Sequence, residues 1–307
     1  MPQVAVYSGT KFGLRGPAYL TLAAGNLWIT NQAGDSVTRF GWRSAGHPVV
    51  LTGPSYGFAA PGPITAGHDH LWIANTLANS ITEVNAADGS VTRKITDVPT
   101  PDSLVLFGKQ LWVANAGANS VSAFSVRTGA LIRTLHGHGL AHPDALVVSN
   151  RRLWVANAAA DTVTELDAAT GATDATLRSK SFGLSGPASE VASRTRLWVG
   201  NEVSGTITEV NTVTGKLVRT LSGASYRLGG AMAMLLADRK LWVTNTFGNS
   251  ITEIDAATGK LIRVLAGHPY GFDHPVSMTA YRGRIWVANS GASTVTELVT
   301  ASVSAVR

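Results

Sequence analysis

The sequence predicts an all-β protein, a seven-bladed β-propeller with four-stranded blades. One unit recurs seven times, with an apolar residue, Trp, a short aliphatic pair and Asn at its centre. The repeated tryptophans, at intervals of 44, 40, 42, 44, 44 and 44 residues, are Trp28, Trp72, Trp112, Trp154, Trp198, Trp242 and Trp286. This period matches a blade of four short strands. The seven units together predict a single domain over residues 1–307.

Four strands are predicted within each unit, as residues 231–265 illustrate. The predicted strands of this unit are Ala233–Leu236, Leu241–Thr244, Ser250–Ile254 and Lys260–Leu265. Asp255–Gly259 forms the hairpin between the last two, where Gly259 supplies the positive φ that such turns need. The second strand is apolar on both sides, as expected between neighbouring blades, whereas the third alternates. Burial is therefore expected to decrease from the second strand outward.

The two ends of the chain are predicted to close the ring. An open array carries atypical capping repeats at its ends, but here the first and last units keep the Trp and Asn core. Residues Gln3–Gly9 resemble the fourth strand of other units, and the chain after Thr294–Leu298 lacks the usual turn-and-Gly pattern. We expect the N-terminal strand to complete the blade that the C-terminal segment begins.

Composition excludes several classes of site. The chain has no cysteine, which excludes disulfides, thiolate metal sites and cysteine nucleophiles. The net charge is +6, but Arg93, Arg133, Arg219 and Arg263 recur at one place in successive units. This spreads the basic charge around the ring and disfavours a nucleic-acid partner. The sequence has no signal-peptide pattern and no apolar run of about 18 residues, so we expect a soluble monomer with no membrane partner; the compartment, including an exported origin, stays open.

Two stretches carry a resemblance to known repeat families. Residues Leu111–Phe124 and Trp242–Asp255 resemble the bacterial YVTN repeat. More distantly, the chain is similar to NHL-repeat propellers and to the streptogramin (virginiamycin B) lyases. That last resemblance implies a seven-bladed propeller that eliminates a lactone with a metal, a His and acidic residues. The lyase blades carry Phe-Thr-Glu after the Trp where this chain carries Val-Ala-Asn, and no lyase catalytic residue can be matched here.

Residues that obey the repeat are interpreted as structural. The Asn after each Trp core is predicted to satisfy backbone groups in the following turn; these residues are Asn31, Asn75, Asn115, Asn157, Asn201, Asn245 and Asn289. Glu83, Glu209 and Glu253 each precede an Arg by ten residues across a hairpin. Cross-strand ion pairs near the rim are the expected result.

The fifth unit departs from the repeat at two acidic residues. Glu190 lies in its first strand where the other units have Leu20, Ile64, Leu104, Leu146, Met234 and Met278. Glu202 follows the Asn of the same unit. Apolar neighbours would raise the pKa of Glu190 and make it a candidate general acid or base, with Glu202 as a second catalytic carboxylate. The alternative is that Glu190 faces solvent in the channel or pairs with Arg194 or Arg196.

A second group of candidates surrounds the prolines that open the first strands. His142 and His274 precede such prolines, and Asp102 and Asp144 follow them. Nitrogen and oxygen donors of this kind predict a divalent metal as a candidate cofactor, with two exposed loop histidines as the alternative. Asp102 and Asp144 are also predicted to bind a ligand, together with Tyr19.

The loops before the first strands repeat an aromatic pattern, for which two roles are open. The stretches are Gly53–Phe58, Ser181–Gly183, Gly223–Tyr226 and Gly267–Phe272. Aromatic rings near a channel mouth can stack on flat ligands. They can equally fill gaps between adjacent blades, which their repetition favours.

These observations leave two functional hypotheses. The first is a binding or scaffold protein that engages a small molecule or a protein partner at the loop-rich mouth of the channel. The second is a metal-assisted lyase or hydrolase that uses the channel carboxylates and a His. Whether the protein is an enzyme stays open, because fold does not specify function.

Overall fold

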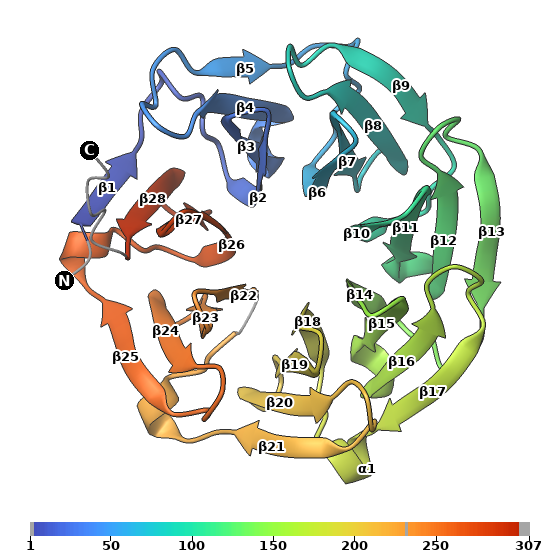
Figure 1. Ribbon diagram of the computed structural model, residues 1–307. Coiled ribbons are helices and arrows are strands. Elements are labelled where there is room, and N and C mark those ends of the chain that lie inside the picture. The colour runs from blue at the N-terminus through green and yellow to red at the C-terminus, as the bar shows by residue number, and fades with distance from the viewer. Residues whose placement is uncertain (1–2, 231–232, 301–307) are drawn as a thin grey trace, which may run out of the picture.

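The computed structural model describes residues 3–230 and 233–300, which form a closed ring of seven four-stranded antiparallel sheets around a central channel (Figure 1). The predicted seven-bladed β-propeller is therefore confirmed. Residues 1–2, 231–232 and 301–307 of the predicted domain lie outside the described residues. The first strand of each blade lies nearest the channel in Figure 1, and the fourth forms the outer edge.

The blades follow one another in chain order. Blade 1 consists of β2 (Pro17–Ala23), β3 (Asn26–Asn31), β4 (Ser36–Gly41) and β5 (Val49–Leu51). Blade 2 consists of β6 (Pro61–Gly67), β7 (His70–Asn75), β8 (Ser80–Asn85) and β9 (Val91–Ile95). Blade 3 consists of β10 (Pro101–Phe107), β11 (Gln110–Asn115), β12 (Ser120–Ser125) and β13 (Leu131–His136). Blade 4 consists of β14 (Pro143–Ser149), β15 (Arg152–Asn157), β16 (Thr162–Asp167) and β17 (Thr173–Arg178).

The remaining blades keep the same order until the ring closes. Blade 5 consists of β18 (Pro187–Ala192), β19 (Arg196–Asn201), β20 (Thr206–Asn211) and β21 (Leu217–Leu221). Blade 6 consists of β22 (Met234–Ala237), β23 (Lys240–Asn245), β24 (Ser250–Asp255) and β25 (Leu261–Ala266). Blade 7 consists of β26 (Pro275–Tyr281), β27 (Arg284–Asn289), β28 (Thr294–Val299) and β1 (Gln3–Tyr7). One short helix, α1 (Ser179–Phe182), lies between blades 4 and 5, and single 3₁₀ turns follow several strands.

The N-terminal strand closes the ring, as the sequence predicts. Strand β1 pairs antiparallel with β28, in a register that runs from Gln3 opposite Val299 to Tyr7 opposite Val295. The Tyr7 hydroxyl donates a hydrogen bond to the Glu297 carboxylate of β28. The two ends of the chain are thus joined within one blade.

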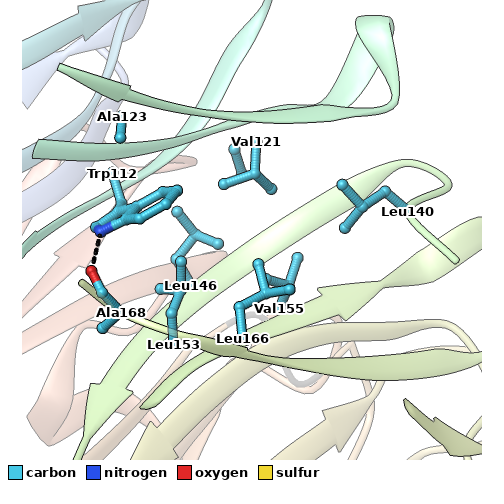
Figure 2. Packing of buried hydrophobic residues seen from close by; sticks show 10 residues of the cluster. Trp112, Val121, Ala123, Leu140, Leu146, Leu153, Val155, Leu166 and Ala168 are labelled. Atoms are coloured by element: carbon cyan, nitrogen blue, oxygen red, sulfur yellow. Dashed lines mark hydrogen bonds between the residues drawn. The ribbon is translucent and has the colours of Figure 1, made fainter. Parts of the chain in front are cut away.

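The repeated tryptophans form the seams between blades. All seven are 0 to 3 % exposed, and each such side chain buries on the order of 200 Å². Figure 2 shows the seam between blades 3 and 4, where Trp112 packs with Leu146, Leu153 and Val155. The Trp112 indole Nε1 donates a hydrogen bond of 3.0 Å to the Ala168 carbonyl in the next blade. Each repeated tryptophan therefore packs against a neighbouring blade and stabilises the contact between the two.

Burial extends further outward than the alternating pattern of the third strand predicts. Five of the six residues of β24 are buried, including Thr252 and Glu253, and the fourth strand is the first to meet solvent. The polar residues of the third strand are buried because they have partners there. Glu253 lies 2.5 Å from Lys240 and from Arg263. The predicted ion pairs across the hairpins are present, but their carboxylates lie inside the blades.

The repeated asparagines are structural, and their common partners are hydroxyl groups. All seven are 0 % exposed. The Asn75 Nδ2 donates to the Ser80 and Thr82 hydroxyls at 3.2 and 2.9 Å. The predicted backbone partners are present at two of the seven: the Asn157 Nδ2 also donates to the Val155 carbonyl, and the Asn201 Oδ1 accepts from the Ser185 N–H, both at 3.2 Å. The Thr82 hydroxyl in turn donates to the Tyr56 carbonyl at 2.8 Å. The hydroxyls five and seven residues after the Asn therefore carry this network, which ties the turn to the loop that enters the blade.

The connections divide between two faces of the ring. The loops that enter each first strand and the turns between second and third strands lie on one face, which we term the loop face. The turns between first and second strands and between third and fourth strands lie on the other, which we term the turn face. Tyr56 and Phe58 of one loop stack at 5.0 Å within the core at a seam, and so do Tyr270 and Phe272 at 5.4 Å. These loop aromatics fill gaps between blades.

No helix in the described parts of the chain combines the length and the apolar composition that crossing a lipid bilayer requires.

Candidate functional site

Tyr19 reaches from blade 1 across blade 2 at the channel mouth. It lies two residues after Pro17, and its backbone N–H donates to the Thr30 hydroxyl at 3.0 Å. Blade 2 has Gly62 beneath the ring, and a Cβ on Gly62 would lie 3.8 Å from the Tyr19 Cε2. That distance is an ordinary van der Waals contact, so the ring packs over this part of blade 2. Tyr19 and Asp102 of blade 3 line the same cavity, and 38 % of Tyr19 is exposed.

Asp102 and Asp144 lie near the Tyr19 hydroxyl, at the start of β10 and β14. Burial, and then the negative charge of Asp144, raise the pKa of Asp102 to about 6. Burial of the Tyr19 hydroxyl raises its pKa above the ordinary value, and the negative charges of Asp102 and Asp144 add to that increase. The structure thus brings together the three residues predicted to bind a ligand, although they come from three blades.

A cavity of about 260 Å³ opens beside this cluster. Its apolar wall includes Tyr19, Pro63 and Val276, and Asp102 is the one acidic residue that lines it among the described residues. Its polar wall consists of Gln32, Thr76 and Ser290. These last three residues are not among the candidates that the sequence predicts. Each directly follows a repeated Asn, so variation at the position after that Asn is the signal that identifies them.

His142 belongs to the aspartate cluster. Its Nδ1 lies 2.5 Å from the Asp144 Oδ1, and its backbone N–H donates to Asn119 of blade 3 at 2.7 Å. Burial raises the pKa of Asp144, and the neighbouring His142 opposes that rise. The His142 side chain is 54 % exposed. It is a loop residue that a ligand could reach.

His274 lies elsewhere on the loop face, in blade 7. Its Nδ1 is 2.9 Å from the Asp273 Oδ1. His142 and His274 occupy equivalent places in blades 4 and 7, and two blades three positions apart in a ring of seven are as far apart as the ring allows (Figure 1). The fold therefore separates the two histidines.

The position of these histidines repeats around the loop face. The residue directly before the first strand has positive φ in six blades; these residues are Gly16, Ala60, Thr100, His142, Gly186 and His274. A Cβ on Gly186 would lie 2.5 Å from the Val203 Cγ2, so the turn of blade 5 leaves no room for a side chain there. Where the residue is His142 or His274, the facing turn residue is small, namely Ala159 or Gly291. In blade 7 the Asp273 carboxylate occupies this space, because a Cβ on Gly291 would lie 2.7 Å from the Asp273 Oδ1.

The donor set does not fit the metal that the lyase resemblance implies. Over residues 3–230 and 233–300, no group of three or more His, Asp or Glu side chains is arranged to hold a metal ion. His142 with Asp144 and His274 with Asp273 are separate pairs. The predicted joint metal site is not assembled by these residues, and we derive no chemistry through a metal.

Glu190 lies in β18, at the seam between blades 4 and 5. It pairs with Val199 of β19, at the position that Leu146 occupies in Figure 2 one blade earlier. Both carboxylate oxygens are buried, and neither has a hydrogen-bond or ion-pair partner among the described residues. Burial raises the pKa of Glu190 well above its ordinary value. The alternative of a pair with Arg194 or Arg196 does not hold, because Arg196 pairs with Glu209 at 2.9 Å and no contact joins Arg194 to Glu190.

Glu202 lies on the loop face, at the place in blade 5 that Gln32 occupies in blade 1. Its backbone N–H donates to the Gly186 carbonyl at 2.9 Å. Glu190 lies four residues further along β18 from Gly186, a rise of about 13 Å at the usual spacing of a strand. The structure does not bring the two predicted catalytic carboxylates together.

Comparisons with known proteins identify the fold. No protein-family model and no curated protein matches the sequence. The crystal structure of selenomethionine-substituted virginiamycin B lyase from Staphylococcus aureus is similar, with a TM-score of 0.81 and 15% identity over 97% of this chain and 99% of that one. A catalytically inactive histidine variant of that lyase, with quinupristin, gives 0.81 and 16% over the same shares. Kuenenia stuttgartiensis hydrazine synthase gives 0.78 and 16%, over 95% of this chain and 97% of that one. At these identities the similarity establishes a shared propeller fold, which the streptogramin lyases and this chain have in common.

Proposed function

We propose that this protein binds a small ligand with a positively charged group at the loop-face mouth of its channel. The observation that carries the proposal is the meeting of Tyr19, Asp102 and Asp144 from three blades beside a cavity of about 260 Å³. The sequence resemblance to YVTN repeats is compatible with a binding role but names no ligand.

The electrostatics of the mouth favour a cation. Asp102 makes no hydrogen bond or ion pair with any described residue. Burial and the neighbouring Asp144 disfavour its ionised form, and His142 opposes this only in part, since the pKa of Asp102 is raised to about 6. A ligand cation would offset both the repulsion between the carboxylates and their partial loss of water. An ammonium group placed between Asp102 and Asp144 is the simplest such partner.

The remaining walls favour an apolar body on the ligand. The Tyr19 ring, Pro63 and Val276 supply apolar surface, and Gln32 and Thr76 supply hydrogen-bonding groups. Sites of this kind combine mostly apolar walls with a few placed polar groups. A small aromatic amine has both features.

Calorimetric titration with phenethylamine, and with the uncharged analogue 2-phenylethanol, tests this proposal. We expect phenethylamine to bind and 2-phenylethanol to bind at least tenfold more weakly, a difference of about 1.4 kcal/mol. Asp102→Asn and Asp144→Asn are expected to weaken phenethylamine binding, whereas Glu202→Gln, a carboxylate change elsewhere on the loop face, is expected to leave it unchanged. Equal binding of the two compounds, or equal binding by all variants, would contradict the proposal. Stoichiometric Mg²⁺ or Mn²⁺ binding that excludes phenethylamine would replace the organic cation with a metal.

The pKa of Asp102 adds a pH dependence. Because the cation binds the ionised carboxylate, affinity is expected to fall as the pH drops below about 6. Titration at pH 7.5 and pH 5 measures the change, and Asp102→Asn should remove most of it.

A lyase or hydrolase is the second candidate function, and Glu190 is the observation that favours it. Burial raises the pKa of this carboxyl group well above its ordinary value, which suits it to general acid catalysis; Glu202, the second carboxylate of the hypothesis, lies apart from it, so Glu190 would act without it. The solved lyase neighbour carries quinupristin, so mass spectrometry of quinupristin incubated with the protein and with Glu190→Gln is the direct test. Cleavage lost in that variant would make the lyase the primary function, and intact quinupristin would remove the candidate.

A further inference from the structure

Blade 1 departs from the repeat on the turn face. In five blades the turn after the third strand begins with a polar residue and then a small or medium one, as in Asn85-Ala86 and Asp167-Ala168. Blade 1 has Gly41-Trp42-Arg43 instead, and its fourth strand begins only at Val49. Trp42 thus adds a large ring where Ala168 packs against the tryptophan of the preceding blade (Figure 2).

Blade 7 contributes a second exceptional ring at the same seam. Tyr281 occupies the last position of its first strand, where the corresponding residues of most blades are small, for example Ala23 and Ala237. The Trp42 and Tyr281 ring centroids lie 5.1 Å apart, edge to face, and Trp42 lies 6.2 Å from the repeated Trp286. Tyr281 is nevertheless 43 % exposed. Part of Tyr281 therefore stays accessible at the seam between blades 7 and 1.

A cavity of about 510 Å³ opens against these rings. Its lining includes Trp42, Arg43 and Tyr281 together with Leu22, Ala23 and Asn26. No acidic residue lines it in the described part of the chain. It lies on the turn face, opposite the acidic mouth described above.

Two arginines beside this cavity have no acidic partner. The Arg43 guanidinium lies 5.0 Å from the centroid of Trp42, and that of Arg282 lies 5.2 Å from the centroid of Tyr281. Among the described residues neither makes an ion pair or a hydrogen bond. Arg284 of the same turn, by contrast, pairs with Glu297. Stacking on a ring limits the motion of a guanidinium while its edges keep their donors free, which is the arrangement that recognises carboxylates.

From these contacts we infer a second binding site, which takes a small aromatic carboxylate. Its flat apolar part packs against Trp42, Tyr281 and Leu22, and its carboxylate accepts hydrogen bonds from Arg43, with Arg282 adding positive charge at the rim. This site is independent of the cation site on the loop face and prefers the opposite charge.

Phenylacetate is the probe, and 2-phenylethanol is its uncharged control. Trp42 is the one tryptophan of the described residues that is not buried, so acrylamide quenching of fluorescence excited at 295 nm reports mainly on it. We expect phenylacetate to protect Trp42 from acrylamide and to bind at least tenfold more tightly than 2-phenylethanol by calorimetry. Phenethylamine, the loop-face probe, should give no protection.

Variants of the two arginines distinguish a ligand-binding role of this site from a purely structural role of the two rings at the seam. Arg43→Gln keeps Trp42 in place and is expected to weaken phenylacetate binding about tenfold, with a smaller loss for Arg282→Gln. Arg239→Gln is the matched control, because Arg239 is an exposed turn-face arginine outside this cavity. Equal affinity for phenylacetate and 2-phenylethanol, or full affinity in Arg43→Gln, would overturn the inference and leave the two rings as a seam filler only.

Discussion

Two sets of buried glutamates show how a cationic partner changes the pKa and the stability cost of a buried carboxylate. The first set lies in the third strands of blades 2, 4, 5, 6 and 7; its members are Glu83, Glu165, Glu209, Glu253 and Glu297, and each has at least one cationic neighbour. The second set is Glu190 alone, in the first strand of blade 5. Both sets are enclosed, yet only Glu190 lacks a charged or hydrogen-bonding partner among the described residues.

The difference lies in what opposes the effect of burial on the pKa of each carboxyl group. Burial raises the pKa of Glu209, and Arg219 and Arg196 on either side oppose that rise. Nothing opposes the rise at Glu190, where burial alone acts. A buried ion pair is neutralised within its blade. An unpaired buried carboxyl group lowers the stability of the fold, and its raised pKa marks it as a candidate site residue.

The largest expected effect comes from removing both cations around Glu209. Arg196→Met with Arg219→Met would leave a fully buried, unpaired carboxylate, which is expected to cost about 3–5 kcal/mol of unfolding free energy. Urea denaturation at pH 7 measures this. Adding Glu209→Leu to the double variant should restore most of the loss, since no charge is then left unpaired. A double variant as stable as the parent would contradict the proposed role of the ion pairs.

Replacing Glu190 is expected to act in the opposite direction. Glu190→Met introduces the residue type that blades 6 and 7 carry at this position, and it should stabilise the protein by about 1–3 kcal/mol at pH 7 because an unpartnered buried polar group is removed. The matched control is Met278→Glu in blade 7, which should destabilise by a similar amount. A loss of stability in Glu190→Met would mean that Glu190 has a partner that stabilises it.

The same contrast predicts a pH dependence. Folded protein keeps the Glu190 proton at pH values where the unfolded chain, with a Glu pKa of about 4.3, has released it. The folded state then binds more protons, so stability is expected to fall as the pH rises above about 4.3. The raised pKa of Asp102 adds a further decrease in stability as the pH rises, and this decrease ends near pH 6. Thermal unfolding from pH 4 to pH 8 measures the slope, which should be shallower in Glu190→Gln; identical slopes would place the titration elsewhere.

The smallest expected effect concerns the glutamate that joins the chain ends. Glu297 accepts a hydrogen bond from Tyr7 and also pairs with Arg284. Tyr7→Phe removes one partner but leaves the arginine, so we expect a loss of about 1 kcal/mol in urea denaturation. Arg284→Met should cost more, because the carboxylate then lacks its cation. The reverse order would mean that the hydroxyl, rather than the ion pair, stabilises the closing blade.

The candidate site was only partly predictable from the sequence. Asp102, Asp144 and Tyr19 were identified as ligand-binding candidates, and the structure brings them together; their role stays a prediction. Glu190 and Glu202 belong to one blade, but four residues along its first strand separate Glu190 from the backbone that Glu202 contacts. His142 and His274 occupy equivalent places in distant blades. Spacing along the chain cannot give such distances across a ring.

The sequence by itself determined the number of blades, the closure by the N-terminal strand and the cross-strand ion pairs, because these follow from a repeat period and from neighbours within a hairpin. Only the tertiary structure decided which departures from the repeat meet. Tyr19 of blade 1 and Asp102 of blade 3 line one cavity, and the seam between blades 7 and 1 brings Trp42 of one end of the chain to Tyr281 of the other. Such contacts depend on the curvature of the closed ring, which places residues hundreds of positions apart in the chain side by side.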